Sequence, residues 1–140
     1  RCIRDMMKAM LGSWLSWLHR SRPLGMRGED AAARYVRRTL RYRVIARNVR
    51  YANGELDLVA LDGNILVFVE VRTRTSEAFG APEQSIRHTK RQRVRRAARQ
   101  FMKARRLHTL TPRIDVIAII WPEAGKPEIR YHQNAFPISG

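Results

Sequence analysis

The sequence has little cysteine, little acid and no long hydrophobic run. Its single cysteine, Cys2, excludes an internal disulfide framework and a cysteine-based zinc site, and it fits a reducing cytoplasm. The four histidines are scattered and make no close metal-ligand spacing. No segment approaches the ~18 consecutive apolar residues of a membrane-spanning helix. We therefore expect a soluble, cytoplasmic protein.

The shortage of acid leaves a large excess of positive charge. The chain has 28 Lys and Arg residues against 12 Asp and Glu, which gives a formal net charge of +16. Such an excess predicts a polyanionic partner, and nucleic acid is the first candidate. An anionic membrane surface is the second candidate. The third explanation is an arginine-rich proteome, which requires no partner.

The chain of 140 residues is long enough for one domain with its own core. Its first 22 residues differ from the rest, because apolar side chains recur at helical spacing between Ile3 and Leu18 and predict an amphipathic helix. This N-terminal extension, residues 1–22, would pack on the domain or a protein partner, lie on a membrane surface, or be loosely ordered. Residues 23–140 would form the domain.

Hydrophobic periodicity predicts an α/β fold for this domain. The predicted order is α-β-β-β-α-β-β, and a mixed β-sheet flanked by helices is the natural packing for such an order. The expected elements are a helix at 24–40, a strand at 42–50, hairpin strands through 54–59 and 66–72, a helix at 82–106, and strands at 112–121 and 128–132.

Two carboxylates lie in apolar strand runs, where an uncompensated charge is unfavourable: Asp57 and Glu70. A two-residue turn at Asp62-Gly63 would set Leu61 across from Asn64. Asp57 and Glu70 would then be diagonal neighbours on one face, roughly 7 Å apart, and would share a divalent ion or a proton. A three-residue turn would instead place them on opposite faces. Strand acids also occur as edge protection or as partners of arginines.

The spacing around this pair suits hydrolysis of a phosphodiester bond. Mg²⁺ takes oxygen ligands, which Asp57, Glu70 and the main-chain carbonyl of Val71 would offer. Arg72 returns to the strand face of Glu70 and would hold the scissile phosphate. Glu29 falls in the first turn of the first predicted domain helix, where an acid also stabilises the helix dipole.

The second predicted helix of the domain has a basic outer face with almost no acid to balance it. This face and the adjoining loops would bind nucleic-acid phosphates. The candidate nucleic-acid-binding residues are Arg74, Arg87, Lys90, Arg91 and Arg95, and the same face carries Arg96, Arg99 and Lys103. No motif that reads base sequence is present.

Several motifs, in consistent order between about Leu24 and Phe136, resemble the YraN-like uncharacterised bacterial protein family. That family is itself similar to the PD-(D/E)XK nuclease superfamily, and to the Holliday junction resolvases in particular. The motifs are Gly28-Glu29, Gly54-Glu55-Leu56-Asp57-Leu58-Val59-Ala60, Val67-Phe68-Val69-Glu70-Val71-Arg72-Thr73-Arg74, Phe79-Gly80, Lys90, Arg113-Ile114-Asp115-Val116 and Asn134-Ala135-Phe136.

The resemblance implies a restriction-endonuclease-like core, α-β-β-β-α-β, and a Mg²⁺- or Mn²⁺-dependent endonuclease that acts on branched or damaged DNA as a homodimer. Asp57 would be the motif aspartate, Glu70 the glutamate of E-x-K, and Glu29 the helix acid that completes the site. Glu55 would be a further ligand or would support the ligands. Arg72 stands at the lysine position, but arginine cannot be a general base, so water activation would depend on the metal.

Two other functions compete with the nuclease. The first is a nuclease fold kept as a non-catalytic nucleic-acid-binding or ribosome-associated protein, in which the carboxylates only pair with arginines. The second is docking to a membrane surface or a protein through residues 1–22. Salt-sensitive binding without cleavage would indicate the first, and loss of lipid or protein association on deletion of residues 1–22 would indicate the second.

Overall fold

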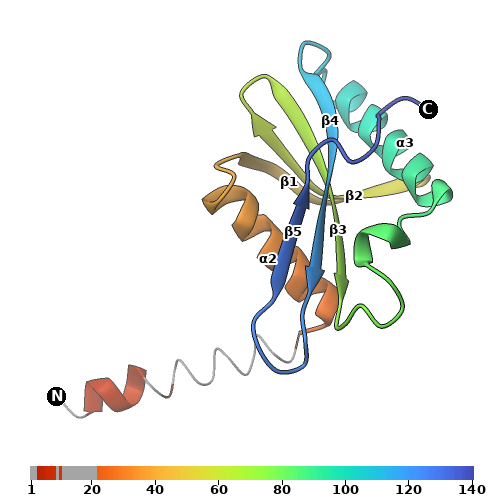
Figure 1. Ribbon diagram of the computed structural model, residues 1–140. Coiled ribbons are helices and arrows are strands. Elements are labelled where there is room, and N and C mark those ends of the chain that lie inside the picture. Colours follow the sequence, from red (N-terminus) through yellow and green to blue (C-terminus); the bar gives the residue numbers. More distant parts are fainter. Residues whose placement is uncertain (1–2, 9, 11–21) are drawn as a thin grey trace.

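The computed structural model describes residues 3–8, 10 and 22–140 of the chain. A five-stranded sheet lies between two helices (Figure 1), which confirms the predicted α/β class. The elements are α2 (Leu24–Arg38), β1 (Arg43–Tyr51), β2 (Gly54–Asp62), β3 (Ile65–Arg74), the 3-10 helix η1 (Pro82–Ser85), α3 (His88–Ala104), β4 (Thr111–Ile120) and β5 (Glu128–His132).

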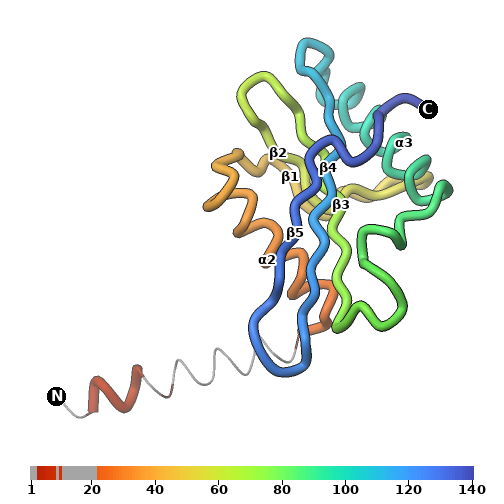
Figure 2. The backbone as a smooth tube through the Cα atoms, in the orientation of Figure 1, coloured from red at the N-terminus to blue at the C-terminus, as the bar shows by residue number. Residues whose placement is uncertain are grey.

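The strands follow one another across the sheet in the order β1-β2-β3-β4-β5. All neighbours are antiparallel except β3 and β4, which are parallel. A parallel pair needs a long crossover, and η1 and α3 supply it. The backbone trace in Figure 2 shows this connection, with α3 on one side of the sheet and α2 on the other. The sheet is therefore mixed, as the element order predicts.

Each helix packs its apolar stripe on one face of the sheet. On the α3 face, Phe68 and Phe101 meet edge to face with ring centroids 6.0 Å apart, a favourable geometry for aromatic rings. On the α2 face, Ala32 and Val36 pack among Leu58 and Val67. These two cores hold the strands rigidly, so a side chain near the middle of the sheet has a fixed position.

The hairpin between β2 and β3 has a two-residue turn, but not at the predicted position. Leu61 pairs with Leu66 and Asp62 with Ile65, so the predicted pairing of Leu61 with Asn64 is wrong and the turn is Gly63-Asn64. Gly63 has φ of 58°, which glycine adopts without steric cost. The observed register differs from the predicted one by two positions. Asp57 therefore lies opposite Glu70 instead of diagonal to it, and both side chains are on the same face of the sheet, as predicted.

The start of the long helix and the position of Glu29 within the first domain helix also differ from the sequence prediction. Pro82 starts a 3-10 helix instead of the long helix, and α3 begins only at His88, because Ile86 and Arg87 have extended backbone. Ile86 is buried in the α3 core, which holds the chain in this extended turn. Glu29 lies in the second turn of α2, so stabilisation of the helix dipole explains its presence less well than expected.

The predicted amphipathic helix at residues 1–22 lies largely outside the described residues. Residues 3–8 are helical, and the side chains of Ile3, Met6 and Met7 are exposed. Among the residues that the structure describes, no helix is long and apolar enough to cross a membrane.

Candidate functional site

Asp57 and Glu70 lie where strands β2 and β3 separate. The last pair of their ladder is Leu58 with Val69, immediately before these two residues. Beyond it, the main-chain N–H of Val71 donates a hydrogen bond of 2.9 Å to Oδ2 of Asp57. The Asp57 carboxylate thus accepts the hydrogen bond from Val71 N–H in place of a main-chain carbonyl of β2. The fork in the sheet brings the carboxylate of one strand against the backbone of the next.

Glu70 is buried beside Asp57. Its side chain is 3% exposed, and its Oε2 accepts no hydrogen bond from any described residue. Burial, followed by the negative charge of Asp57, raises the pKa of the Glu70 carboxyl to about 8, while Lys90 and Arg72 oppose the shift. Two facing carboxylates need a proton or a cation between them, so Glu70 holds a proton at neutral pH unless a cation takes its place.

Two basic side chains reach the same glutamate from different elements. Lys90, at the start of α3, has its Nζ 3.4 Å from Oε1 of Glu70 and 3.2 Å from Oε1 of Glu55. Arg72, on β3, has its Nε 3.7 Å from Oε1 of Glu70. Lys90 also lowers the pKa of the Glu55 carboxyl through a hydrogen bond. We call Glu55, Asp57, Glu70, Arg72 and Lys90 the carboxylate site.

Glu29 approaches this site from the opposite helix, α2. Burial, followed by the negative charge of Asp57, raises the pKa of the Glu29 carboxyl. Arg47 opposes that shift, and its guanidinium lies 2.7 Å from Asp30. α2 can come near because Gly28 has no side chain: a Cβ there would lie 1.9 Å from Oγ1 of Thr73 on β3.

The donor set fits a hard divalent cation that also uses water and substrate oxygens as ligands. Two carboxylates side by side, one with an unpartnered oxygen, offer what Mg²⁺ takes from proteins, usually one or two carboxylates. Among the described residues, no three or more His, Cys, Asp or Glu side chains gather closely enough to hold a metal by themselves. Glu29 is therefore a neighbour of the pair and not a third ligand in this geometry.

The predicted nucleic-acid-binding residues do not form one surface. Arg74, Arg87 and Arg91 are exposed, whereas Lys90 is directed to the carboxylate site. Arg95 contradicts the prediction of an outward position, because it is 6% exposed and its Nε donates a hydrogen bond of 2.7 Å to the carbonyl of Pro137. The C-terminal residues fold back over α3 and cover it, a long-range contact that helical periodicity does not reveal.

Sequence reasoning also missed the position of Lys90. Lys90 precedes the buried Val94 by four residues and so lies on the inner side of α3, beside the sheet. The four-residue spacing between Lys90 and Val94 indicates this inner position, but Lys90 stands in a long run of basic residues that suggests an outer face. Arg47 and Asp30 were missed as well, and no local pattern marks them, because their ion pair joins β1 to α2.

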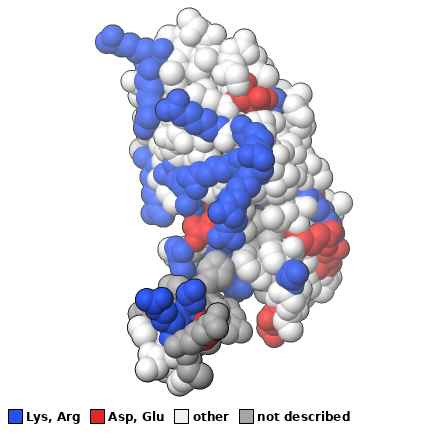
Figure 3. Space-filling view, turned by 90° about the vertical axis from the view of Figure 1, so that its left-hand side faces the viewer, with Lys and Arg blue, Asp and Glu red and all other residues white. Residues whose placement is uncertain are grey.

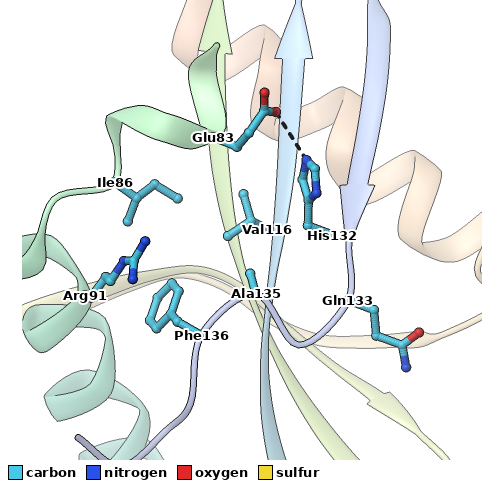
Figure 4. Close-up of a pocket in the computed structure, with 8 residues that line it drawn as sticks. All are labelled: Glu83, Ile86, Arg91, Val116, His132, Gln133, Ala135 and Phe136. Carbon is cyan, nitrogen blue, oxygen red and sulfur yellow. Dashed lines mark hydrogen bonds and ion pairs between the residues drawn. The ribbon is translucent and has the colours of Figure 1, made fainter. Parts of the chain in front are cut away.

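A pocket of about 490 Å³ lies next to the carboxylate site (Figure 4). Val116 forms part of its lining and pairs with Glu70 on one side and with His132 on the other, so one row of the sheet connects pocket and site. His132 Nε2 lies at hydrogen-bond distance, 3.2 Å, from Oε2 of Glu83 across the pocket rim. The Arg91 guanidinium lies 5.3 Å from the centroid of the Phe136 ring on the opposite wall.

Comparison with known proteins identifies relatives over most of the chain. Residues 28–119 match the uncharacterised protein family UPF0102. A UPF0102 protein of Geobacter sulfurreducens is 41% identical over 121 residues, which cover 86% of this chain and 94% of that protein. One of Symbiobacterium thermophilum is 42% identical over 118 residues, 83% of this chain and 98% of that protein. One of Rhodococcus opacus is 38% identical over 113 residues, 81% and 95% respectively.

Proposed function

The chain belongs to the uncharacterised protein family UPF0102, whose name assigns no activity, and from this premise and the carboxylate site we propose a metal-dependent endonuclease that hydrolyses phosphodiester bonds in DNA. The family resemblance seen in the sequence is thereby confirmed, and the reaction is inferred from the site. The observation that carries the proposal is the pair formed by the buried Glu70 and the half-buried Asp57 at the fork between β2 and β3. A protein does not keep two such carboxylates together without a cation or a proton to offset them.

Asp57, Glu70 and the main-chain carbonyl of Val71 would hold Mg²⁺ or Mn²⁺. The ion would supply a water of lowered pKa and would offset negative charge that develops on the phosphate. Val71 is proposed as the third ligand because it follows Glu70 directly and its N–H donates a hydrogen bond to Asp57.

The basic residues of the site have separate roles in this proposal. Arg72 remains charged at every accessible pH, so it would bind the scissile phosphate and not abstract a proton. Lys90, held by Glu55 and Glu70, would oppose the rise in the pKa of Glu70 and so make it easier for a cation to replace the proton. Glu29 would orient water from the side of α2.

A second candidate function is supported by the same contacts. Lys90 and Arg72 already place two positive charges within 3.7 Å of Glu70, which partly satisfies its carboxylate without a metal. In that case the fold would serve a nucleic-acid-binding or ribosome-associated protein that does not cut. The +16 net charge would provide the affinity.

Cleavage of labelled DNA separates the two functions. Duplex, single-stranded and four-way-junction DNA, with a matched RNA, would be incubated with Mg²⁺, Mn²⁺ or a chelator. Branched DNA is the first substrate to test because of the resemblance to Holliday junction resolvases. The variants are Asp57→Asn and Glu70→Gln, which keep side-chain size, and the matched control is Glu123→Gln, an exposed carboxylate in the loop between β4 and β5.

The nuclease proposal requires metal-dependent cleavage in the wild type and in Glu123→Gln, with a loss of at least ~10²-fold in both site variants. Thermal denaturation gives a readout without turnover, because Mg²⁺ should raise the melting temperature of the wild type and not that of Glu70→Gln. Salt-sensitive binding with no cut in any metal, and no Mg²⁺-dependent stabilisation, would favour the non-catalytic function.

A further inference from the structure

A groove lined almost wholly by arginine lies beside α2, on the side of the molecule away from α3. Its volume is about 330 Å³, and its lining residues are Arg22, Asp30, Arg34, Arg37, Arg38 and Arg47. Figure 3 views the molecule from this side and shows Lys and Arg side chains gathered in a band with few acidic groups. We call the groove lined by these six residues the arginine groove. The sequence prediction placed nucleic-acid contacts on α3, not here.

Asp30, the one acidic residue that lines the groove, neutralises only part of its positive charge. Asp30 binds Arg22 at 2.5 Å and Arg47 at 2.7 Å. Arg34, Arg37 and Arg38 make no ion pair with any residue that the structure describes, and all three are exposed. Nε of Arg47 is buried, and no described residue accepts a hydrogen bond from it. The groove therefore contains several guanidinium donors that have no acceptor within the described chain.

The arginine groove continues towards the carboxylate site. A second hollow, of about 400 Å³, shares Arg22, Asp30 and Arg47 with it and extends to Glu29 and Arg50. Glu29 follows Gly28, where a Cβ would lie 1.9 Å from Oγ1 of Thr73, the residue after Arg72 on β3. The second hollow therefore reaches the part of α2 that packs beside the carboxylate site. An extended anion in the groove would meet the site at its α2 end.

We propose that the arginine groove binds the phosphodiester backbone of a nucleic acid and directs it to the carboxylate site. The claim that the groove directs the nucleic acid to the carboxylate site rests on the proposed function. The claim that the groove binds the nucleic-acid backbone does not. Guanidinium groups recognise phosphate oxygens with two parallel hydrogen bonds. Arg34, Arg37 and Arg38, which make no ion pair with any described residue, repeat such a group within five residues of α2. Among the described residues, no exposed large hydrophobic side chain lines the arginine groove itself, and only Met26 lines the second hollow, so the described surface offers few of the apolar contacts of a membrane-binding site.

The test compares two triple variants of the full chain that lose the same charge. The first, Arg34→Ala with Arg37→Ala and Arg38→Ala, removes the unpaired groove arginines. The matched control, Arg96→Ala with Arg99→Ala and Lys103→Ala, removes three exposed cations from α3. Alanine is a good helix former, so both helices should persist, and circular dichroism checks this. Binding of a labelled 20-base-pair DNA is measured in chelator at several salt concentrations.

The groove variant should bind DNA at least ~10-fold more weakly than the wild type, and its salt slope should fall by about three, or ~0.9 for each phosphate contact. The control should change much less. A further triple variant, each groove arginine to Lys, keeps the charge and should give an intermediate loss, because lysine lacks the planar pair of donors. Wild-type binding by the alanine variant, or equal losses in the two triple variants, would overturn the proposal.

Two added measurements separate this inference from the nuclease proposal and from a membrane. Because binding is measured in chelator, weaker binding by the groove variant of a protein that cuts no DNA would leave the inference standing while the nuclease proposal fails. Cleavage that is unaffected by the groove variant would refute the inference alone. Vesicles with anionic lipid provide the other comparison: an alanine variant that loses vesicle binding and keeps DNA binding would assign the groove to a membrane.

Discussion

Lys90 Nζ lies 3.4 Å from Oε1 of Glu70, although the two residues belong to a helix and a strand that are separated by the whole η1 segment. This contact makes Lys90 the positive charge that most strongly lowers the pKa of Glu70, ahead of Arg72. The E-x-R spacing on β3 places a planar guanidinium beside the glutamate, and α3 adds the compact ammonium group of Lys90. The carboxylate site thus combines two cations of different shape from two elements.

Replacement of Lys90 by Ala should reduce cleavage about 10- to 100-fold, in the range seen when a residue that supports a metal ligand is removed. Without Lys90 the pKa of Glu70 rises further, so a higher pH is needed to expose the carboxylate, and the rate profile should shift to more alkaline pH. Lys103→Ala, an exposed change on the same helix, is the control. A loss of rate with no shift of the profile would contradict this role.

The raised pKa of Glu70 also predicts how stability depends on pH. Between the ordinary value near 4.5 and about 8, the folded protein holds a proton that the unfolded chain has released. The free energy of unfolding should therefore fall as pH rises through this window. Glu70→Gln has no such group, and its free energy of unfolding should fall less over the same range. Denaturant titrations of both proteins in chelator, at pH 5, 6.5 and 8, provide the measurement.

Mg²⁺ offers a check on the same prediction. The cation binds the ionised carboxylate, so its stabilisation of the wild type should be larger at pH 8 than at pH 5. If the pH dependence of the wild type and of Glu70→Gln were parallel, Glu70 would have an ordinary pKa.

The sequence allowed the element order to be predicted, because each periodicity had one clear interpretation. Short apolar runs around Asp57 and Glu70 marked two strands, and the helical stripe from Val94 to Phe101 marked α3. The carboxylate pair was predictable for the same reason, since a charge in an apolar strand stands out. Its exact register was not, because Asp62-Gly63 and Gly63-Asn64 are both plausible two-residue turns and only the packing of the strands selects one.

The features that could not be predicted depend on contacts between distant segments. Arg95 is buried by the chain near Pro137, and nothing local to α3 indicates that cover. The arginine groove likewise combines α2 with Arg47 of β1 through Asp30. Composition indicated how much positive charge the protein carries, but only the fold determines which surface gathers it.

Gly28→Ala should destabilise the protein by about 1–3 kcal/mol, the usual cost of overpacking. The added Cβ would lie 1.9 Å from Oγ1 of Thr73, so α2 must shift away from β3 and carry Glu29 with it. Gly25→Ala, on the same helix with nothing within 4 Å of its Cβ, is the matched control and should not destabilise. Thr73→Ala in the Gly28→Ala background should restore part of the loss, as denaturant unfolding would show. Equal stability of Gly28→Ala and Gly25→Ala would refute the close approach.

Asp115 should prove to be a structural residue, although it lies in one of the sequence motifs that carry the family resemblance. It is fully buried and accepts two hydrogen bonds of 2.9 Å from the Arg113 guanidinium, one of 2.9 Å from the N–H of Asn134, and one from the hydroxyl of Tyr131. It thus joins β4 to β5 and to the turn that follows. Asp115→Ala should cost about 3–5 kcal/mol, since it leaves Arg113 without its partner in a largely buried position.

The double variant Arg113→Met with Asp115→Leu removes both charges and should be more stable than Asp115→Ala, because no buried charge is left unpaired. Mg²⁺-dependent stabilisation should persist in the double variant, because neither residue belongs to the carboxylate site. Thermal and denaturant unfolding of the wild type, the single variant and the double variant measure both effects. A metal response that disappears with Asp115, while circular dichroism remains native, would instead assign it to the site and would show that the ligand set extends from β3 onto β4.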